Sequence, residues 1–272
     1  MAELSFRRFI RSKRRIEKAI DFVLQRLLLP VDYFKFLVQQ PQQFGKRLEI
    51  LRKFRHIHKA VPCAHLEAEA LYIADSILRI PLSLRGDIIE CGTYKGGGTC
   101  KLSIVAKLTG RRLFACDSFV GLPEPKPFDK IHVHCDGTRE TYQRGDYSAS
   151  VDEVCANLEK YGEPDVVTLV PGWFQETLPL LKQKRFVLVF IDVDLYESII
   201  CCIENLWPVL QKGCRFFTHE AQSMLTVKAF QDMEFWKVRM GMNTPPIFVG
   251  AKRGLGITKK FLGYIRKPIT PL

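Results

Sequence analysis

Short apolar segments alternate with amphipathic helical segments from residue 86 onward, and this order constrains the fold more than any other feature. The expected strands are 87–91, 113–116, 166–170, 186–191 and 214–218. The expected helices follow the first strand up to residue 108 and then cover 151–161, 174–181 and 196–210. Strands that alternate with helices are joined by right-handed crossovers, so the sequence predicts a doubly wound, mostly parallel α/β sheet. Apolar segments at 247–250 and 262–266 predict a C-terminal antiparallel hairpin at its edge.

The first 80 residues have a different character. Residues 1–60 carry 15 Lys/Arg against 5 Asp/Glu, which accounts for most of the net charge of +12. Apolar residues recur on one helical face over 16–28, Pro30 is expected to end that helix, and a second helix is expected over 64–78. The sequence therefore predicts a basic helical extension or lid over 1–80 and a main domain over 81–272, with an insertion at 121–147.

Cysteine usage and hydropathy bear on location. The nine cysteines are scattered, with no C-x-x-C pair, which indicates reduced thiols in a cytoplasmic protein. No apolar run approaches the roughly 18 residues of a spanning helix. The basic amphipathic helix could lie on anionic lipid, which would make the protein peripheral to a membrane, or it could pack on a domain or a second copy.

A glycine-rich turn follows the first expected strand, at the place where open α/β sheets bind ligands. It reads Ile88-Ile89-Glu90-Cys91-Gly92-Thr93-Tyr94-Lys95-Gly96-Gly97-Gly98-Thr99. A dinucleotide site requires G-x-G-x-x-G, but Tyr94 occupies the second glycine position, which disfavours NAD. The alternative is that the glycines serve only close helix packing. The predicted cofactor-binding residues here are Glu90, Gly92, Thr93, Gly96 and Gly98.

Asp117 and Ser118 end the second expected strand, 25 residues after Gly92. An acid at that place binds the ribose of nucleotide cofactors, although a helix cap or turn former would have the same composition. Both residues are predicted to bind the cofactor.

Three segments resemble the macrocin O-methyltransferase (TylF/MycF-type) family, whose members have the Rossmann-like class I methyltransferase fold. The glycine turn is similar to the family's first motif, and Asp117–Pro123 to its "DSFEGLP". Residues 172–179 are similar to "GWFxDTLP", and residues 191–198 to "LDGDLYES". The resemblance implies S-adenosylmethionine as methyl donor, a hydroxyl acceptor on a sugar, a divalent cation such as Mg²⁺ or Mn²⁺, and a homodimer.

The resemblance also implies roles for acceptor-side residues. Asp192 would be a metal ligand, Asp194 a second ligand or the catalytic base, and Trp173 would lie beside the adenine of the cofactor. A metal-bound hydroxyl has a lowered pKa, so a nearby base removes its proton more easily. Both aspartates could instead cap the following helix, and Trp173 could be a core aromatic.

The chain departs from the family after the fifth expected strand. The family has "DDY" there, whereas this chain reads Thr218-His219-Glu220-Ala221. His219 and Glu220 are predicted metal ligands, and the imidazole shifts preference from Mg²⁺ towards Mn²⁺, Fe²⁺ or Zn²⁺. Alternatively, His219 is the catalytic base and no metal binds. His132 and His134, in the insertion, are expected to be solvated. His56, His58 and His65 precede the first strand and could sit in a lid over the active site, and the sequence does not rank them.

The function predicted from the sequence is a methyl transfer from S-adenosylmethionine to a hydroxyl of a small, glycosyl acceptor. One rival is a cofactor-binding protein that has lost catalysis, because His219-Glu220 replaces the acids of the family. Another is an RNA methyltransferase, suggested by the isoelectric point of 9.3. The positive charge lies outside the main domain and lacks interleaved aromatics, so no nucleic-acid partner is expected.

Overall fold

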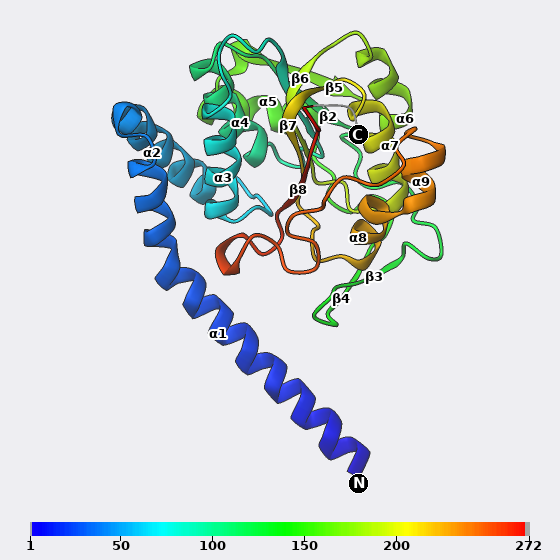
Figure 1. Cartoon of the computed structure of the whole chain (residues 1–272). Coiled ribbons are helices and arrows are strands. Elements are labelled where there is room, and N and C mark those ends of the chain that lie inside the picture. Colours follow the sequence, from blue (N-terminus) through cyan, green and yellow to red (C-terminus); the bar gives the residue numbers. More distant parts are fainter. Residues whose placement is uncertain (1, 270–272) are drawn as a thin grey trace.

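A six-stranded sheet forms the centre of the protein. The computed structural model describes the backbone of residues 2–269 and the side chains of residues 19–269. The strand order is β5-β2-β1-β6-β7-β8, in which β8 alone is antiparallel to its neighbour (Figure 1). The strands are β1 (Asp87–Cys91), β2 (Leu113–Asp117), β5 (Val167–Pro171), β6 (Phe186–Ile191), β7 (Leu210–Thr218) and β8 (Gly263–Arg266). The predicted doubly wound sheet is confirmed.

Helices cover both faces of the sheet, because successive strand residues point to opposite faces. Ile88 packs in the core beneath α4, whereas Ile89 packs in the core beneath α7. The first layer contains α2 (Phe44–Ala60), α3 (Glu67–Leu78), α4 (Gly97–Leu108) and α5 (Val151–Tyr161). The second contains α6 (Phe174–Thr177), α7 (Tyr196–Leu206), α8 (Met224–Gln231) and α9 (Met233–Val238). Each strand is therefore apolar on both sides, as its sequence requires.

The N-terminal helix is longer than predicted. α1 runs from Ala2 to Val38 and includes Pro30, so the expected break there is wrong. Pro30 is exposed, and the carbonyl that loses its amide partner one turn earlier can be solvated. The sequence also did not predict α2, and α3 begins at Glu67, three residues later than expected. α1 extends away from the body of the protein (Figure 1).

Two C-terminal boundaries also differ. α7 ends at Leu206, because Pro208 cannot continue a helix, and β7 begins at Leu210 instead of residue 214. The register of β7 on β6 shifts between Phe186 and Leu188, which accommodates the additional strand residues. The expected hairpin consists of β8 and a single antiparallel bridge from Val249 to Tyr264.

The insertion at 121–147 is folded over the sheet. It contains the hairpin of β3 (Ile131–Val133) and β4 (Arg139–Thr141). Asp129 accepts hydrogen bonds from the Tyr196 amide at the start of α7, at 2.9 and 3.1 Å, and lies 2.8 Å from His132 Nε2. His132 and His134 are both buried, so the expectation that they are solvated is wrong. Buried polar contacts, which the sequence does not reveal, hold this insertion against α7.

Candidate functional site

One cavity of about 700 Å³ opens at the carboxyl ends of the parallel strands, where doubly wound sheets bind ligands. Its walls come from the turn after β1, the ends of β2, β6 and β7, and the insertion. Residues 62–65, which precede α3, and residues 260–261 complete it. Every predicted site residue except Glu90 and Gly96 lines this cavity.

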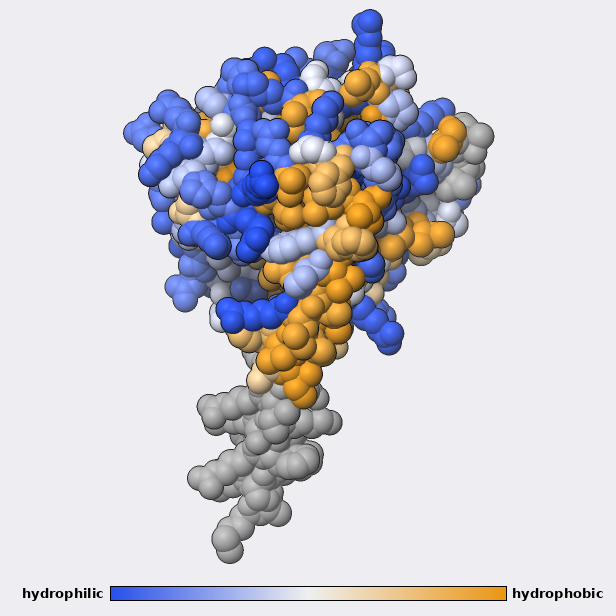
Figure 2. Space-filling view, turned by 90° about the vertical axis from the view of Figure 1, so that its left-hand side faces the viewer, coloured by the Kyte–Doolittle hydropathy of each residue, from blue (hydrophilic) through white to orange (hydrophobic). Residues whose placement is uncertain are grey.

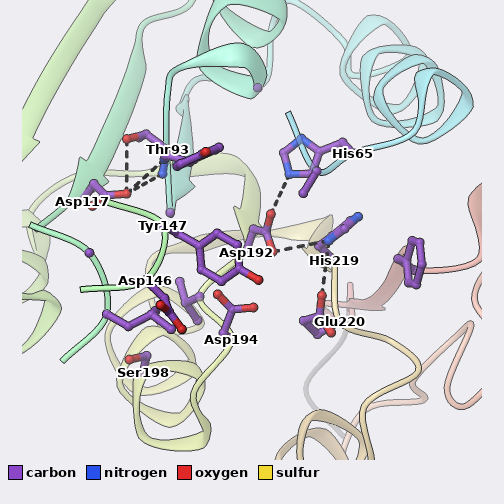
Figure 3. Close-up of a pocket in the computed structure, with 18 of the residues that line it drawn as sticks. His65, Thr93, Asp117, Asp146, Tyr147, Asp192, Asp194, Ser198, His219 and Glu220 are labelled. Carbon is purple, nitrogen blue, oxygen red and sulfur yellow. Dashed lines mark hydrogen bonds and ion pairs between the residues drawn. The ribbon is translucent and has the colours of Figure 1, made fainter. Parts of the chain in front are cut away.

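The turn after β1 is organised by Asp117. Its Oδ2 accepts hydrogen bonds from the backbone amides of Thr93 at 2.7 Å and Tyr94 at 3.3 Å (Figure 3). Gly92 has a φ of +87°, and a Cβ there would lie 1.9 Å from the carbonyl oxygen of Asp192. Only glycine fits this position, because the turn passes directly against the end of β6. The turn and Asp117 thus form one rigid wall of the cavity.

Glu90 lies behind this wall. It is fully buried and accepts a 2.6 Å hydrogen bond from Thr99 Oγ1, and its Oε1 has no hydrogen-bond partner among the described residues. Burial raises the pKa of Glu90 to about 8. Gly96 also lies outside the cavity lining, with Val154 Cγ1 3.1 Å from the position of a Cβ. The predicted cofactor contacts of these two residues remain predictions.

Ser118 and Trp173 border the same side of the cavity as Asp117. Ser118 Oγ donates a 2.8 Å hydrogen bond to the Gly121 carbonyl, which starts the insertion. Trp173 follows β5 and precedes α6, and its ring is half-buried. An aromatic wall beside a carboxylate suits a nucleoside, whose ribose hydroxyls donate and whose base stacks.

The opposite side of the cavity gathers carboxylates and imidazoles. His219 Nδ1 lies 3.4 Å from Asp192 Oδ1 and 3.4 Å from Glu220 Oε1, and it has no hydrogen-bond partner among the described residues. Carboxylate oxygens of Asp192, Asp194 and Glu220 lie within 4.8 Å of one another. Figure 3 shows this group apart from Thr93 and Asp117. An orphaned buried nitrogen facing two carboxylates fits a divalent cation.

The charges in this group perturb one another. Burial opposes ionisation of Asp192, but the charge of His219 and the hydrogen bond and charge of His65 hold its pKa well below the usual range. Burial likewise disfavours a charged His219, but Asp192 and Glu69 raise its pKa. Burial raises the pKa of Asp194, and repulsion from Asp192 and Glu220 raises it further. Asp194 also has a φ of +56°, a strained conformation typical of functional sites.

Two residues that the sequence did not assign belong to this group. His65 Nε2 lies 2.9 Å from Asp192 Oδ2, and Glu69 Oε2 lies 3.2 Å from His219 Nε2. Both residues precede the first strand by about 20 positions, in a segment with no recognisable motif. From the insertion, His134, Glu140 and Tyr147 also line the cavity.

Comparison with known families decides where this chain belongs. The model of the "Macrocin-O-methyltransferase (TylF)" family matches residues 72–245, more than half of the chain. The chain belongs to this family. The matched range contains the glycine turn, Asp117, Asp192 and Glu220, but His65 and Glu69 precede it. The family resemblance inferred from the three sequence segments is therefore confirmed.

Two curated proteins resemble the chain over part of its length. It is 36% identical over 132 residues to the "8-demethyl-8-(2,3-dimethoxy-alpha-L-rhamnosyl)-tetracenomycin-C 4'-O-methyltransferase" of Streptomyces olivaceus, covering 47% of this chain and 50% of that protein. It is 27% identical over 137 residues to the "Mycinamicin III 3''-O-methyltransferase" of Micromonospora griseorubida, covering 47% and 52%. The chain thus spans about half the length of the curated relatives it matches.

Solved structures of other proteins share the fold of this chain. The O-methyltransferase NovP superimposes with a TM-score of 0.57 at 19% identity, over 76% of this chain and 83% of that one. The calicheamicin methyltransferase CalS11 superimposes with a TM-score of 0.52 at 18% identity, over 81% and 92%. The predicted class I methyltransferase fold is confirmed by these structures.

Proposed function

We propose that this protein is an S-adenosylmethionine-dependent O-methyltransferase that acts on a hydroxyl of a small glycosyl acceptor. The observation that carries the proposal is the division of one cavity into a glycine-turn side and a carboxylate–imidazole side. Family membership supports the methyl donor. The printed names of two relatives, a rhamnosyl-tetracenomycin and a mycinamicin methyltransferase, support a glycosylated acceptor.

The cofactor would be held by the turn side. Asp117 and Ser118 would receive the ribose, Trp173 the adenine, and the turn from Gly92 the amino-acid end. When bound, S-adenosylmethionine supplies a methyl group activated by the sulfonium. One cavity would hold both the cofactor and the acceptor. Binding would then align the acceptor oxygen with the methyl carbon, so the reaction would not need an encounter of two free molecules.

The acceptor hydroxyl would be activated on the carboxylate–imidazole side of the cavity. Asp192, His219 and Glu220 are suited to hold a divalent cation, which would lower the pKa of a bound hydroxyl. Asp194 lines the cavity beside them and is the proposed base. Its carboxylate oxygen lies within 4.8 Å of those of Asp192 and Glu220, so in its ionised form it could take the proton of a hydroxyl held there. The hydroxyl proton would pass to Asp194 while the oxygen forms its bond to the methyl carbon. The bond from that carbon to the sulfonium sulfur would break, and S-adenosylhomocysteine would be the leaving group.

The decisive assay uses labelled S-adenosylmethionine with sugar nucleotides, glycolipids and glycosylated metabolites, with and without chelator. We expect label transfer by the wild type, and loss of transfer both with chelator and in Asp192→Ala. Activity that is indifferent to both changes would refute the metal centre while leaving methyl transfer intact. Cofactor binding without turnover on any acceptor would instead favour a protein that has lost catalysis.

The exposed face of α1 is a proposed contact surface, defined here as the apolar stripe. Figure 2 shows a hydrophobic band along this helix where it leaves the body. Among the described residues, no helix is long and apolar enough to cross a bilayer. The stripe side chains are at least 38% exposed: Ile20, Val23, Leu27, Leu28, Val31, Phe34 and Val38. We propose peripheral contact with an anionic membrane, to which the basic residues of the helix are attracted.

Liposomes of anionic and of neutral lipid test this contact. We expect the full chain to co-sediment with the anionic liposomes only, and a chain without residues 1–30 to remain in solution. Light scattering on the same two proteins tests the other use of the stripe. A dimer that becomes a monomer on deletion, without lipid binding, would replace the membrane proposal by a homodimer.

A further inference from the structure

Gly97 and Gly98, at the start of α4, leave space for the segment that carries His65 into the site. A Cβ on Gly98 would lie 2.9 Å from His65 Cε1 and 2.4 Å from Glu90 Oε1. A Cβ on Gly97 would lie 2.8 Å from Cys63 Cβ. Neither glycine has a positive φ, so the backbone conformation does not require glycine there. These glycines make room for residues 62–65, which they hold against the start of α4.

Two imidazoles face one carboxylate. His65 Nε2 lies 2.9 Å from Asp192 Oδ2, and His219 Nδ1 lies 3.4 Å from Asp192 Oδ1. The ring centroids are 4.9 Å apart, and one ligand atom from each of the three residues lies within 4.8 Å of the others. Atoms bound to one ion at roughly 2.1 Å are separated by about 3 to 3.5 Å. The two imidazole–carboxylate distances, 2.9 and 3.4 Å, are close to this spacing.

The far nitrogen of each imidazole has its own partner. His219 Nε2 lies 3.2 Å from Glu69 Oε2, and Glu69 is fixed by the backbone amides of Leu66 at 2.8 Å and Phe261 at 3.0 Å. His65 Nδ1 lies 3.4 Å from Cys63 Sγ. Metal-binding histidines commonly donate their second ring N–H to such a partner, which fixes the tautomer. Because a metal-binding nitrogen must be deprotonated, an ion at this place would displace the proton of the hydrogen bond between His65 Nε2 and Asp192 Oδ2.

We propose that His65 is a metal ligand, so that two imidazole nitrogens, from His65 and His219, bind one ion together with the carboxylate of Asp192. Imidazole ligands favour Mn²⁺, Fe²⁺, Co²⁺ or Zn²⁺ over Mg²⁺, which prefers oxygen. The inference rests on the proposed cation centre, but not on methyl transfer. It also makes the N-terminal extension part of the site, since His65 and Glu69 both precede the family match.

The competing interpretation is that His65 only orients Asp192 through a hydrogen bond. Loss of either role weakens metal binding, since changes to such orienting partners alone reduce affinity by about 10- to 100-fold. Affinity therefore does not separate them, but the number of bound imidazoles does. A ligand role gives two bound imidazoles, and an orienting role gives one.

Pulsed electron paramagnetic resonance on the chelator-stripped full chain, loaded with one equivalent of Cu²⁺, counts bound imidazoles through their remote nitrogens. We expect two in the wild type and one in each of His65→Gln and His219→Asp. The matched control is His134→Gln, because His134 lies in a neighbouring group with Glu140 and Glu220 and should leave the count at two. A single imidazole in the wild type, unchanged in His65→Gln, would overturn the proposal.

His219→Asp keeps the test decisive should His65→Gln fail to fold. If His65 is a ligand, this variant retains one imidazole, and if it only orients Asp192, the variant retains none. Selectivity gives a second readout, in which His65→Gln weakens Co²⁺ binding by at least about 10-fold and leaves Mg²⁺ binding within about 3-fold. Equal affinities of the wild type for Mg²⁺ and Co²⁺ would contradict the proposal that His65 is a metal ligand. Neither measurement includes S-adenosylmethionine or an acceptor, so its result does not depend on whether the protein transfers methyl groups. The labelled-methyl assay tests that activity separately.

Discussion

The two sides of the cavity are built in different ways. The glycine-turn side, which we call the donor side, runs from Gly92 to Asp117. It is made by one turn and the end of the adjacent strand, and its contacts are hydrogen bonds from backbone amides to the Asp117 carboxylate. The carboxylate–imidazole side, which we call the acceptor side, joins segments that are up to 155 positions apart in the sequence, from His65 to Glu220. The first is a local structure that a short motif encodes. The second exists only once the sheet and the N-terminal extension have assembled.

The two sides also differ in charge. On the donor side the Asp117 carboxylate is satisfied by the amides of the turn. On the acceptor side, carboxylates and imidazoles crowd together, and burial and mutual charge shift the pKa values of Asp192, Asp194 and His219. Such perturbation is typical of reacting groups. The difference supports our proposal that the donor side binds the cofactor and the acceptor side performs the chemistry.

Asp192→Asn should produce the largest effect. We expect kcat/KM to fall by about 1,000-fold, because the variant removes the charge shared by the proposed ligands. The affinity for S-adenosylmethionine should stay within about 3-fold, since Asp192 belongs to the other side. Labelled-methyl transfer and calorimetry measure the two quantities, with the exposed Asp152→Asn as control. Equal losses in both quantities would break the division into two sides.

Gly92→Ala tests a place where the two sides touch. A Cβ there would lie 1.9 Å from the Asp192 carbonyl oxygen, so we expect a loss of at least about 3 kcal/mol in the free energy of unfolding. Gly110→Ala is the control, because its φ is also positive, at +64°, but no atom lies within 4 Å. It should cost about 1 kcal/mol. Equal costs in urea unfolding would show that the contact is unimportant.

Asp117→Ala should act on the donor side alone. It removes the acceptor for the amides of Thr93 and Tyr94, so we expect the dissociation constant for S-adenosylmethionine to rise about 10- to 100-fold. Metal binding should be unchanged. Ser118→Ala, which loses only the bond to the Gly121 carbonyl, should have a smaller effect. Unaltered cofactor binding in Asp117→Ala would place the cofactor elsewhere.

Glu90→Gln should give the smallest effect, visible in the pH dependence of stability. Burial raises the pKa of Glu90 from 4.5 to about 8, so between these values the folded chain holds a proton that the unfolded chain releases. The free energy of unfolding therefore falls as pH rises through this window. The variant lacks this titration, so between pH 5 and pH 8 its Tm should fall less than the Tm of the wild type.

Thermal unfolding in chelator, at several pH values, measures this difference. Identical pH profiles for the two proteins would mean that Glu90 is not buried as described. Cofactor affinity adds a second comparison. Because Glu90 lies behind the turn, its substitution should weaken S-adenosylmethionine binding less than Asp117→Ala does, whereas a direct contact would make the two losses similar.

The sequence predicted the sheet and the donor side because both depend on local patterns. Alternating apolar segments define the strands, and the spacing from Gly92 to Asp117 places both residues at the carboxyl edge. The continuous α1 was not predicted, because the cost of Pro30 depends on whether its surroundings are exposed. β7 was predicted too short, because the shifted register with β6 is a tertiary property.

The acceptor side was predicted only where a motif exists. Asp192 and Asp194 follow a buried strand in a family segment, and His219 and Glu220 follow the next one. His65 and Glu69 carry no such signal, since their position opposite Asp192 and His219 arises from packing of α3 on the sheet. One signal was available in retrospect. Three consecutive glycines exceed what the turn conformation needs, and two of them make room for residues 62–65.

Calorimetric titration of S-adenosylmethionine, in the presence of chelator, tests the division into a binding side and a reacting side most directly. The wild type and Asp192→Asn should both bind the cofactor stoichiometrically and with affinities within about 3-fold of each other, while Asp117→Ala binds about 10- to 100-fold more weakly. Absence of binding by the wild type, or a loss in Asp192→Asn as large as that in Asp117→Ala, would contradict the account.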